Sequence, residues 1–149
     1  MKDATINLFT IGVNGKTPKL FFELLKENNI DLVIDIRINN KSQFAGFAKG
    51  GYEYLGYFLK KILNVEYKHD IYLAPTKDLL ERYHKSYDWL YYQEAFNQII
   101  SERKIKEYFL NRYSTFHNIC LLCAEATPEK CHRRLVAEAI FGEKAVKHL

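Results

Sequence analysis

Short apolar runs alternate with longer amphipathic segments along the whole chain. The run 32–36 is almost uniformly apolar, which is typical of a strand buried on both faces of a parallel sheet. Thr17-Pro18 and Thr76 are suited to cap helices that follow them. The predicted strands are 5–11, 32–36, 65–69, 118–124 and 145–149, and the predicted helices are 18–27, 52–63, one after Thr76, 89–113 with a break near Ser101, and one from Thr127-Pro128 through Ile140.

Regular alternation of strands and helices predicts an α/β sandwich around a mostly parallel sheet. The chain has 149 residues, 48% of them hydrophobic, so it is long enough for one core and short for two. No repeat, linker or biased segment interrupts it. We therefore predict that residues 1–149 form a single domain.

Charge and cysteine content narrow the class of protein. The 22 basic and 18 acidic residues are spread evenly, without a basic tail, so they permit an anionic partner but do not demand one. No apolar run reaches the roughly 20 residues that span a bilayer, and the start of the chain lacks the pattern of a secretory signal. Three cysteines, an odd number, argue against a disulfide framework. We predict a cytoplasmic protein with reduced thiols and no membrane partner.

Chemically active residues stand where three predicted strands end. Ligands of open α/β sheets bind beyond the carboxyl ends of the strands, so these residues are expected to meet at one edge. They are Thr10-Ile11-Gly12, Asp35-Ile36-Arg37 and Cys123-Ala124-Glu125, followed by Cys131-His132-Arg133 in the next predicted helix. The alternative for Asp35 and Arg37 is a structural ion pair that locks a loop.

His132 and Cys123 each have two interpretations. A helical wheel started at Cys131 turns His132 toward the sheet, places Arg133 at the margin of the apolar face and points Arg134 to solvent. His132 is then either a buried histidine with one hydrogen bond or part of an anion site at a helix N-terminus. Cys123 is either an inert buried thiol or a nucleophile whose pKa is lowered by that same environment.

The cysteines do not predict a metal site. Cys120 and Cys123 are three apart in a strand, so they point to opposite faces and cannot chelate or form a disulfide. Zinc held by Cys123, Cys131 and His132 is not expected, because neighbouring side chains on a helix diverge by about 100° and no fourth ligand is evident. The sequence does not identify a cofactor.

Several familiar signatures are absent. The phosphatase arginine six residues after the cysteine is replaced by Glu129, and no G-x-G-x-x-G or P-loop motif is present. One aromatic stretch is suited either to packing or to stacking on nucleic acid. It contains Arg82, His84, Lys85, Tyr87, Tyr91 and Tyr92.

The order and spacing of these motifs resemble a known family. The motifs are Thr10-Ile11-Gly12, then 32–37 with Ser42 and Gly46-Phe47, then 121–125 with 128–133, and the terminal Val146-Lys147-His148-Leu149. Together they are similar to the domain of unknown function 488 family, over almost the whole chain. The resemblance implies a Rossmann-type fold and a shared site of Asp35, Arg37, Cys123, Glu125, Cys131, His132 and Arg133. The chain departs from the family pattern at Asn40 and Ala45, where prolines are usual.

We hypothesise a small enzyme or ligand-binding protein with a pocket for an anion, such as the phosphate of a nucleotide or nucleic acid. Cys123 is the candidate nucleophile and His132 the proton shuttle, and Asp35 or Glu125 acts as general base or orients Arg37. The expected ligand contacts are Thr10, Arg37, Ser42, Cys131 and Arg133. The alternatives are a non-catalytic nucleic-acid-binding module, whose affinity falls steeply with salt, and a structural protein acting through a partner.

Overall fold

The computed structural model describes residues 5–41 and 46–149, and their five strands form one sheet in which every pairing is parallel. The strand order is β3-β2-β4-β1-β5. The strands are β1 (Asn7–Gly12), β2 (Leu32–Asp35), β3 (Glu66–His69), β4 (Asn118–Cys123) and β5 (Val146–His148). The prediction of a parallel α/β sandwich is confirmed, including an edge strand at the end of the chain.

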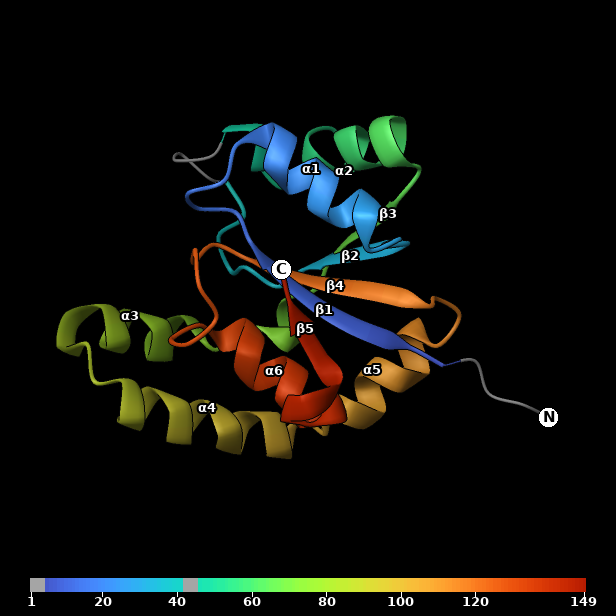
Figure 1. The fold of residues 1–149 in the computed structure, drawn as a ribbon. Helices are drawn as coiled ribbons and strands as arrows, with labels where there is room; N and C mark the ends of the chain where they lie inside the picture. The colour runs from blue at the N-terminus through green and yellow to red at the C-terminus, as the bar shows by residue number, and fades with distance from the viewer. Residues whose placement is uncertain (1–4, 42–45) are drawn as a thin grey trace.

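Helices cover both faces of the sheet and complete three layers (Figure 1). One face carries α1 (Pro18–Glu27) and α2 (Leu55–Phe58), and the other carries α3 (Lys77–Ser86), α4 (Trp89–Glu102), α5 (Ile105–Tyr113) and α6 (His132–Phe141). Three 3₁₀ turns lie at Gly46–Ala48, Ile71–Leu73 and Glu143–Ala145. Among the described residues, no helix has the length and hydropathy needed to cross a bilayer.

Local sequence explains where α1 and α3 begin. The hydroxyls of Thr17 and Thr76 accept the backbone N–H groups of Leu20 at 3.1 Å and Leu79 at 3.2 Å, as expected of N-caps. The predicted helix 52–63 is shorter than expected: a single α-helical stretch, α2, continues as a π-helical turn from Leu59 to Leu63. The predicted segment 89–113 is two helices, α4 and α5. They are separated at Lys104, whose φ of 51° is left-handed.

The prediction that the last helix opens at Thr127-Pro128 is wrong. Pro128 begins a turn in which its carbonyl accepts the N–H of Cys131 at 3.2 Å, and α6 starts only at His132. The guanidinium of Arg134 donates two hydrogen bonds to the Glu129 carbonyl, at 3.1 and 3.2 Å. In a helix starting at Pro128 this carbonyl would instead accept a backbone N–H of the next turn. Cys131 is therefore the N-cap residue with an extended backbone, φ −136° and ψ 139°.

Each face of the sheet has its own apolar core. Cys120 and Leu122 of β4 pack with the α1 side, while Leu121 and Cys123 pack with α4, α5 and α6. Cys120 and Cys123 thus lie on opposite faces, as predicted from strand periodicity.

The carboxyl ends of β1, β2 and β4 lie side by side. Gly12 is paired with Cys123, and Asp35 is paired with Leu122. The helices after β1 and β2 cover one face and the helix after β4 covers the other (Figure 1). Such a divergence opens a crevice at the strand ends, where ligands of α/β proteins bind.

Candidate functional site

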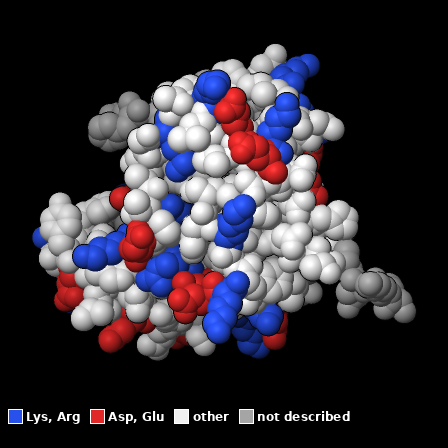
Figure 2. Space-filling model, in the orientation of Figure 1, with Lys and Arg blue, Asp and Glu red and all other residues white. Residues whose placement is uncertain are grey.

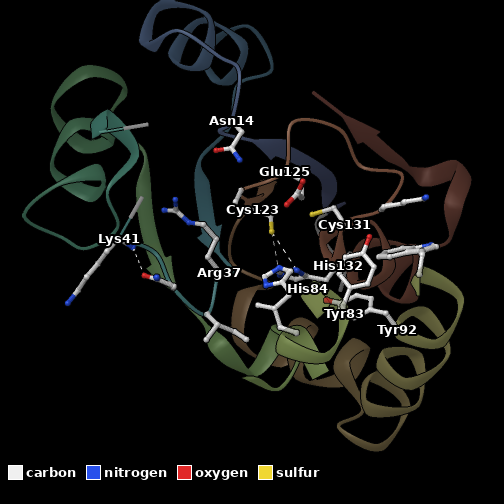
Figure 3. A pocket seen from close by; sticks show the side chains of 16 residues that line it. Asn14, Arg37, Lys41, Tyr83, His84, Tyr92, Cys123, Glu125, Cys131 and His132 are labelled. Atoms are coloured by element: carbon white, nitrogen blue, oxygen red, sulfur yellow. Dashed lines mark hydrogen bonds between the residues drawn. The ribbon is translucent and has the colours of Figure 1, made fainter. Parts of the chain in front are cut away.

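A cavity of about 480 Å³ opens at these strand ends. Figure 3 shows Arg37 and Lys41 on one side, Tyr83 and Tyr92 on the other, and Cys123 and His132 between them. The basic side comes from the segment after β2, the aromatic side from α3 and α4, and the sulfur and imidazole from β4 and α6. Segments far apart in sequence therefore supply chemically different walls.

Asp35 and Arg37 form a buried bidentate ion pair. The Nε and Nη2 atoms of Arg37 donate to the two Asp35 oxygens at 2.8 and 2.7 Å, and neither side chain is more than 3% exposed. Arg37 Nη2 also donates to the Ala48 carbonyl at 2.8 Å, and the Tyr67 hydroxyl donates to Asp35 Oδ2 at 2.7 Å. The alternative interpretation, a structural ion pair, is confirmed, because the pair and its hydrogen bonds connect β2 to β3 and to the segment before α2.

The same arginine also faces the cavity. Arg37 lines the cavity, and its Nη1 is buried without a hydrogen-bond partner among the described residues. A buried donor without a partner costs about 1–3 kcal/mol, and more when it is charged. An anion that came within hydrogen-bond distance of Nη1 would satisfy this donor.

Arg133 lies behind the cavity wall rather than in it. It is completely buried, although the helical wheel placed it at the margin of the apolar face. Its Nη1 donates to the Glu125 carbonyl at 2.7 Å and lies 3.5 Å from Cys131 Sγ, and its Nε donates to the Thr10 hydroxyl at 3.3 Å. Arg133 is buried because the loop 124–131 folds over it. A helical wheel shows only the directions of side chains within one helix, so it does not include this loop.

Gly12 allows that loop to approach β1. A Cβ atom at this position would lie 1.7 Å from the carbonyl oxygen of Glu125 and 2.9 Å from Nη1 of Arg133. The contact is with backbone, so a larger residue forces the loop outward. Thr10, two residues earlier, is fully buried and also contacts His148 Nδ1 at 2.5 Å.

His132 is held by one hydrogen bond and touches the thiol of Cys123. Its Nε2 lies 2.9 Å from the Ile36 carbonyl, which assigns the proton to Nε2 and leaves Nδ1 as an acceptor. The two ring nitrogens are 3.5 and 3.6 Å from Cys123 Sγ. The interpretation of His132 as a buried histidine with a hydrogen bond is confirmed, and the same ring forms part of the cavity wall.

Cys123 and Cys131 have different acidities. A hydrogen bond from the Cys131 thiol lowers the pKa of Cys123, helped by the Ala124 backbone and the charge of Arg133, against the opposing effect of burial. The same hydrogen bond, together with burial, raises the pKa of Cys131. Burial raises the pKa of Cys120 on the other face. Cys123 is thus the thiol of the three that is favoured as a thiolate.

One comparison with known proteins identifies the family. Residues 17–140 match the model described as Domain of unknown function DUF488. The chain belongs to this family. No curated protein and no solved structure shows a match to the chain. The resemblance found in the sequence motifs is confirmed, and the activity of this DUF488 protein must be argued from its site.

The DUF488 site brings three metal-ligating groups together, contrary to the divergence expected from the helical wheel. The ligand atoms of Cys123, Cys131 and His132 lie within 4.8 Å of one another. The angles of the helical wheel do not apply to Cys131, because it is the N-cap residue with an extended backbone and not part of the helix. Three ligands suit a tetrahedral zinc site with one open position, but Arg133 places a positive charge against Cys131 Sγ. The described residues add no fourth His, Cys, Asp or Glu ligand to this group.

The predicted site residues fall into two groups, those that line the cavity and those that lie behind its wall. Arg37, Cys123, Glu125, Cys131 and His132 line the cavity, whereas Thr10, Asp35 and Arg133 lie behind it and hold the residues that do. Ser42 and Ala45 lie outside the described residues.

Sequence reasoning missed much of the cavity wall. The missed residues include Asn14, Lys41, Leu80, Tyr83, Trp89 and Lys130, while Tyr92 was assigned to the aromatic stretch. In that stretch Tyr92 packs in the core, Arg82 stacks on Tyr91 at 3.9 Å, and Tyr87 stays 75% exposed. No motif marks the aromatic wall, because helical spacing of Tyr and Trp is also what core packing requires.

Proposed function

We propose that this DUF488 protein is a small cysteine-dependent enzyme whose cavity binds an anionic, phosphate-bearing ligand of the nucleotide class. The observation that carries the proposal is Arg37, which lines the same cavity as Cys123 and whose buried Nη1 has no hydrogen-bond partner among the described residues. A guanidinium held rigidly by a carboxylate is suited to bind phosphate with its remaining donor.

The opposite wall favours a ligand with a planar ring. Tyr83, Trp89 and Tyr92 form one aromatic cluster, with Trp89 and Tyr92 stacked at 5.2 Å between ring centroids. A cavity with basic groups on one side and aromatic rings on the other suits a phosphate joined to a base. Lys41 and Lys130 add positive charge at its lining.

The reacting groups lie between the two walls. Cys123 would supply a thiolate next to the bound ligand, and His132 Nδ1 would accept or return a proton. Glu125 lines the same cavity with an exposed side chain, so it is the carboxylate available to substrate as a general base. Asp35 is engaged by Arg37 and Tyr67, and its role is to orient Arg37.

Alkylation of the three thiols tests this proposal. With limiting iodoacetamide at neutral pH, mass spectrometry should find Cys123 modified first, and inorganic phosphate or adenosine monophosphate should slow that modification several-fold. Cys120→Ser is the matched control, because Cys120 is buried on the other face and its loss should leave the rate unchanged. Cys123→Ser should abolish the early adduct and leave the circular dichroism spectrum unchanged.

Two outcomes would remove the proposal. Equal labelling of all three cysteines would show that Cys123 has no special reactivity. Failure of both anions to protect Cys123, together with binding of a single-stranded oligonucleotide that weakens steeply between about 50 and 200 mM salt, would favour a non-catalytic nucleic-acid-binding module instead.

A further inference from the structure

Two of the three thiols face each other across the floor of the cavity. Cys123 ends β4, Cys131 precedes α6, and both line the cavity while being no more than 4% exposed. Their sulfur atoms lie within 4.8 Å of one another, and Figure 3 shows the Cys131 side chain directed toward Cys123. Two thiols this close can form a disulfide when one of them moves by a few ångströms.

The backbone around Cys131 permits that movement. Residues 124–131 contain no helix or strand, and Cys131 makes no side-chain capping bond at the start of α6. Cys123, in contrast, is fixed in the ladder opposite Gly12. Cys131 can therefore approach a stationary Cys123 without breaking a strand ladder. Its own backbone bonds are two, from its N–H to the Pro128 carbonyl and from the Arg134 N–H to its carbonyl, each at 3.2 Å, and they lie at the junction of the loop and α6.

The surroundings distinguish an attacking thiol from a resolving one. Cys123 Sγ lies 3.5 and 3.6 Å from the two ring nitrogens of His132, a group that can take its proton, whereas Cys131 Sγ contacts the guanidinium of Arg133. Arg133 Nη1, 3.5 Å from Cys131 Sγ, can stabilise negative charge on Cys131 later in a reaction. This asymmetry is what a two-step thiol–disulfide exchange requires.

We propose that Cys123 and Cys131 are a redox dithiol that reduces the disulfide bond of a small anionic molecule, with Cys131 as the resolving thiol. The inference rests on the proposed role of Cys123 as nucleophile, keeps the requirement for an anionic ligand but not for a phosphate, and names a disulfide as the bond that Cys123 attacks. The basic side of the cavity, Arg37 and Lys41, binds the negative groups of that disulfide.

The exchange proceeds in two balanced steps. The Cys123 thiolate attacks one sulfur of R–S–S–R′, which forms a Cys123–S–R disulfide and releases R′–S⁻ to take a proton from water. Cys131 then gives its proton to His132 Nδ1 and attacks Cys123 Sγ, which forms the Cys123–Cys131 disulfide and releases R–S⁻ to be protonated. Two electrons pass from the protein to the substrate, and a thiol reductant returns the protein to its dithiol form.

Oxidised glutathione, an anionic disulfide, provides the test. The reduced, full-length Cys120→Ser protein is treated anaerobically, with and without a metal chelator, and its intact mass is followed. We expect loss of two hydrogen atoms, release of two reduced glutathione molecules, and a Cys123–Cys131 link in the peptide map. The same protein carrying Cys131→Ser should instead hold one glutathionyl group on Cys123, and with Cys123→Ser the reaction should slow at least about tenfold.

The contradicting results separate this inference from the function on which it rests. A stable glutathionyl group on Cys123 with Cys131 still present would overturn the dithiol, while leaving Cys123 as the reactive thiol. Equal reaction of Cys131 after Cys123→Ser would overturn the assigned order. A metal ion that blocks both thiols until the chelator is added would also overturn the proposal and identify a metal centre. Selective iodoacetamide labelling with phosphate protection would leave the anion-binding enzyme standing in each case except the last.

Discussion

At the residue scale, two buried arginines and one glycine hold the residues that line the cavity. Arg37 and Arg133 are both buried, and most of their N–H groups donate to neighbouring residues, among them Asp35 for Arg37 and the Glu125 carbonyl for Arg133. Gly12 matters for what it lacks, because the Glu125 carbonyl occupies the space of a Cβ. Burying two guanidinium groups is costly unless they are paired, so their neighbours are not free to vary independently.

Gly12→Ala should destabilise the protein by more than about 2 kcal/mol, because the added methyl overlaps a backbone carbonyl rather than a flexible side chain. The measurement is the urea unfolding midpoint. Gly46→Ala is the control, since a Cβ there meets nothing within 4 Å among the described residues, and it should change stability by less than about 0.5 kcal/mol. Equal midpoints for the two variants would show that the 124–131 loop yields without cost.

At the element scale, hydrogen bonds from side chains reinforce the backbone ladder between neighbouring strands and connect the strands to segments outside the sheet. The Tyr67 hydroxyl of β3 donates to Asp35 of β2 at 2.7 Å and accepts from the Gly51 N–H at 3.1 Å. The start of α6 is likewise placed by Arg134 and by the turn at Pro128, not by helix propensity alone. These bonds set the position of Arg37 and Cys131 at the cavity.

Tyr67→Phe removes one donor to the buried Asp35 carboxylate and should cost about 1.5–3 kcal/mol of unfolding free energy. In this variant phosphate should also protect Cys123 less well from alkylation, because Asp35 loses a hydrogen bond that helps to fix the position of Arg37. Tyr57→Phe is the matched control, since Tyr57 is 52% exposed and should tolerate the change within about 0.5 kcal/mol. The measurement is the unfolding free energy of both variants by denaturant titration. Similar losses in the two variants would contradict the role assigned to the Tyr67 hydroxyl.

At the scale of the whole molecule, a second buried carboxylate joins the sheet to the helical layer. Asp70, which follows β3, accepts the hydroxyls of Tyr108 at 2.9 Å and Tyr113 at 2.5 Å from α5. Burial and the Asp70 hydrogen bond raise the pKa of Tyr108 to about 12, and the same causes raise the pKa of Tyr113. Both hydroxyls must stay protonated to make these bonds.

Stability should therefore fall in alkali. The folded state holds the tyrosine protons more tightly than the unfolded state, so this contribution is complete below about pH 10 and is lost as the pH rises through about 12. Melting temperatures measured from about pH 8 to about pH 12 should decline, and the double variant Tyr108→Phe with Tyr113→Phe should decline less steeply. Equal slopes in the two proteins would mean that Asp70 does not link folding to these protons.

Most of the fold was predictable because it depends on local patterns. Buried parallel strands appear as apolar runs, and the caps Thr17 and Thr76 act over three residues. The failures share one cause. The start of α6, the burial of Arg133 and the convergence of Cys131 on Cys123 depend on contacts between the 124–131 loop and β1, which no local pattern contains.

The sequence by itself determined the family, the parallel α/β architecture and the edge of the sheet at which chemistry gathers, since periodicity and strand ends are properties of neighbouring residues. Only the tertiary structure decided which of those residues face the cavity and which support it from behind. It also decided that two thiols meet there and that aromatic rings from α3 and α4 close the opposite side. Such distances are set by packing between layers, where residues remote along the chain compete for the same space.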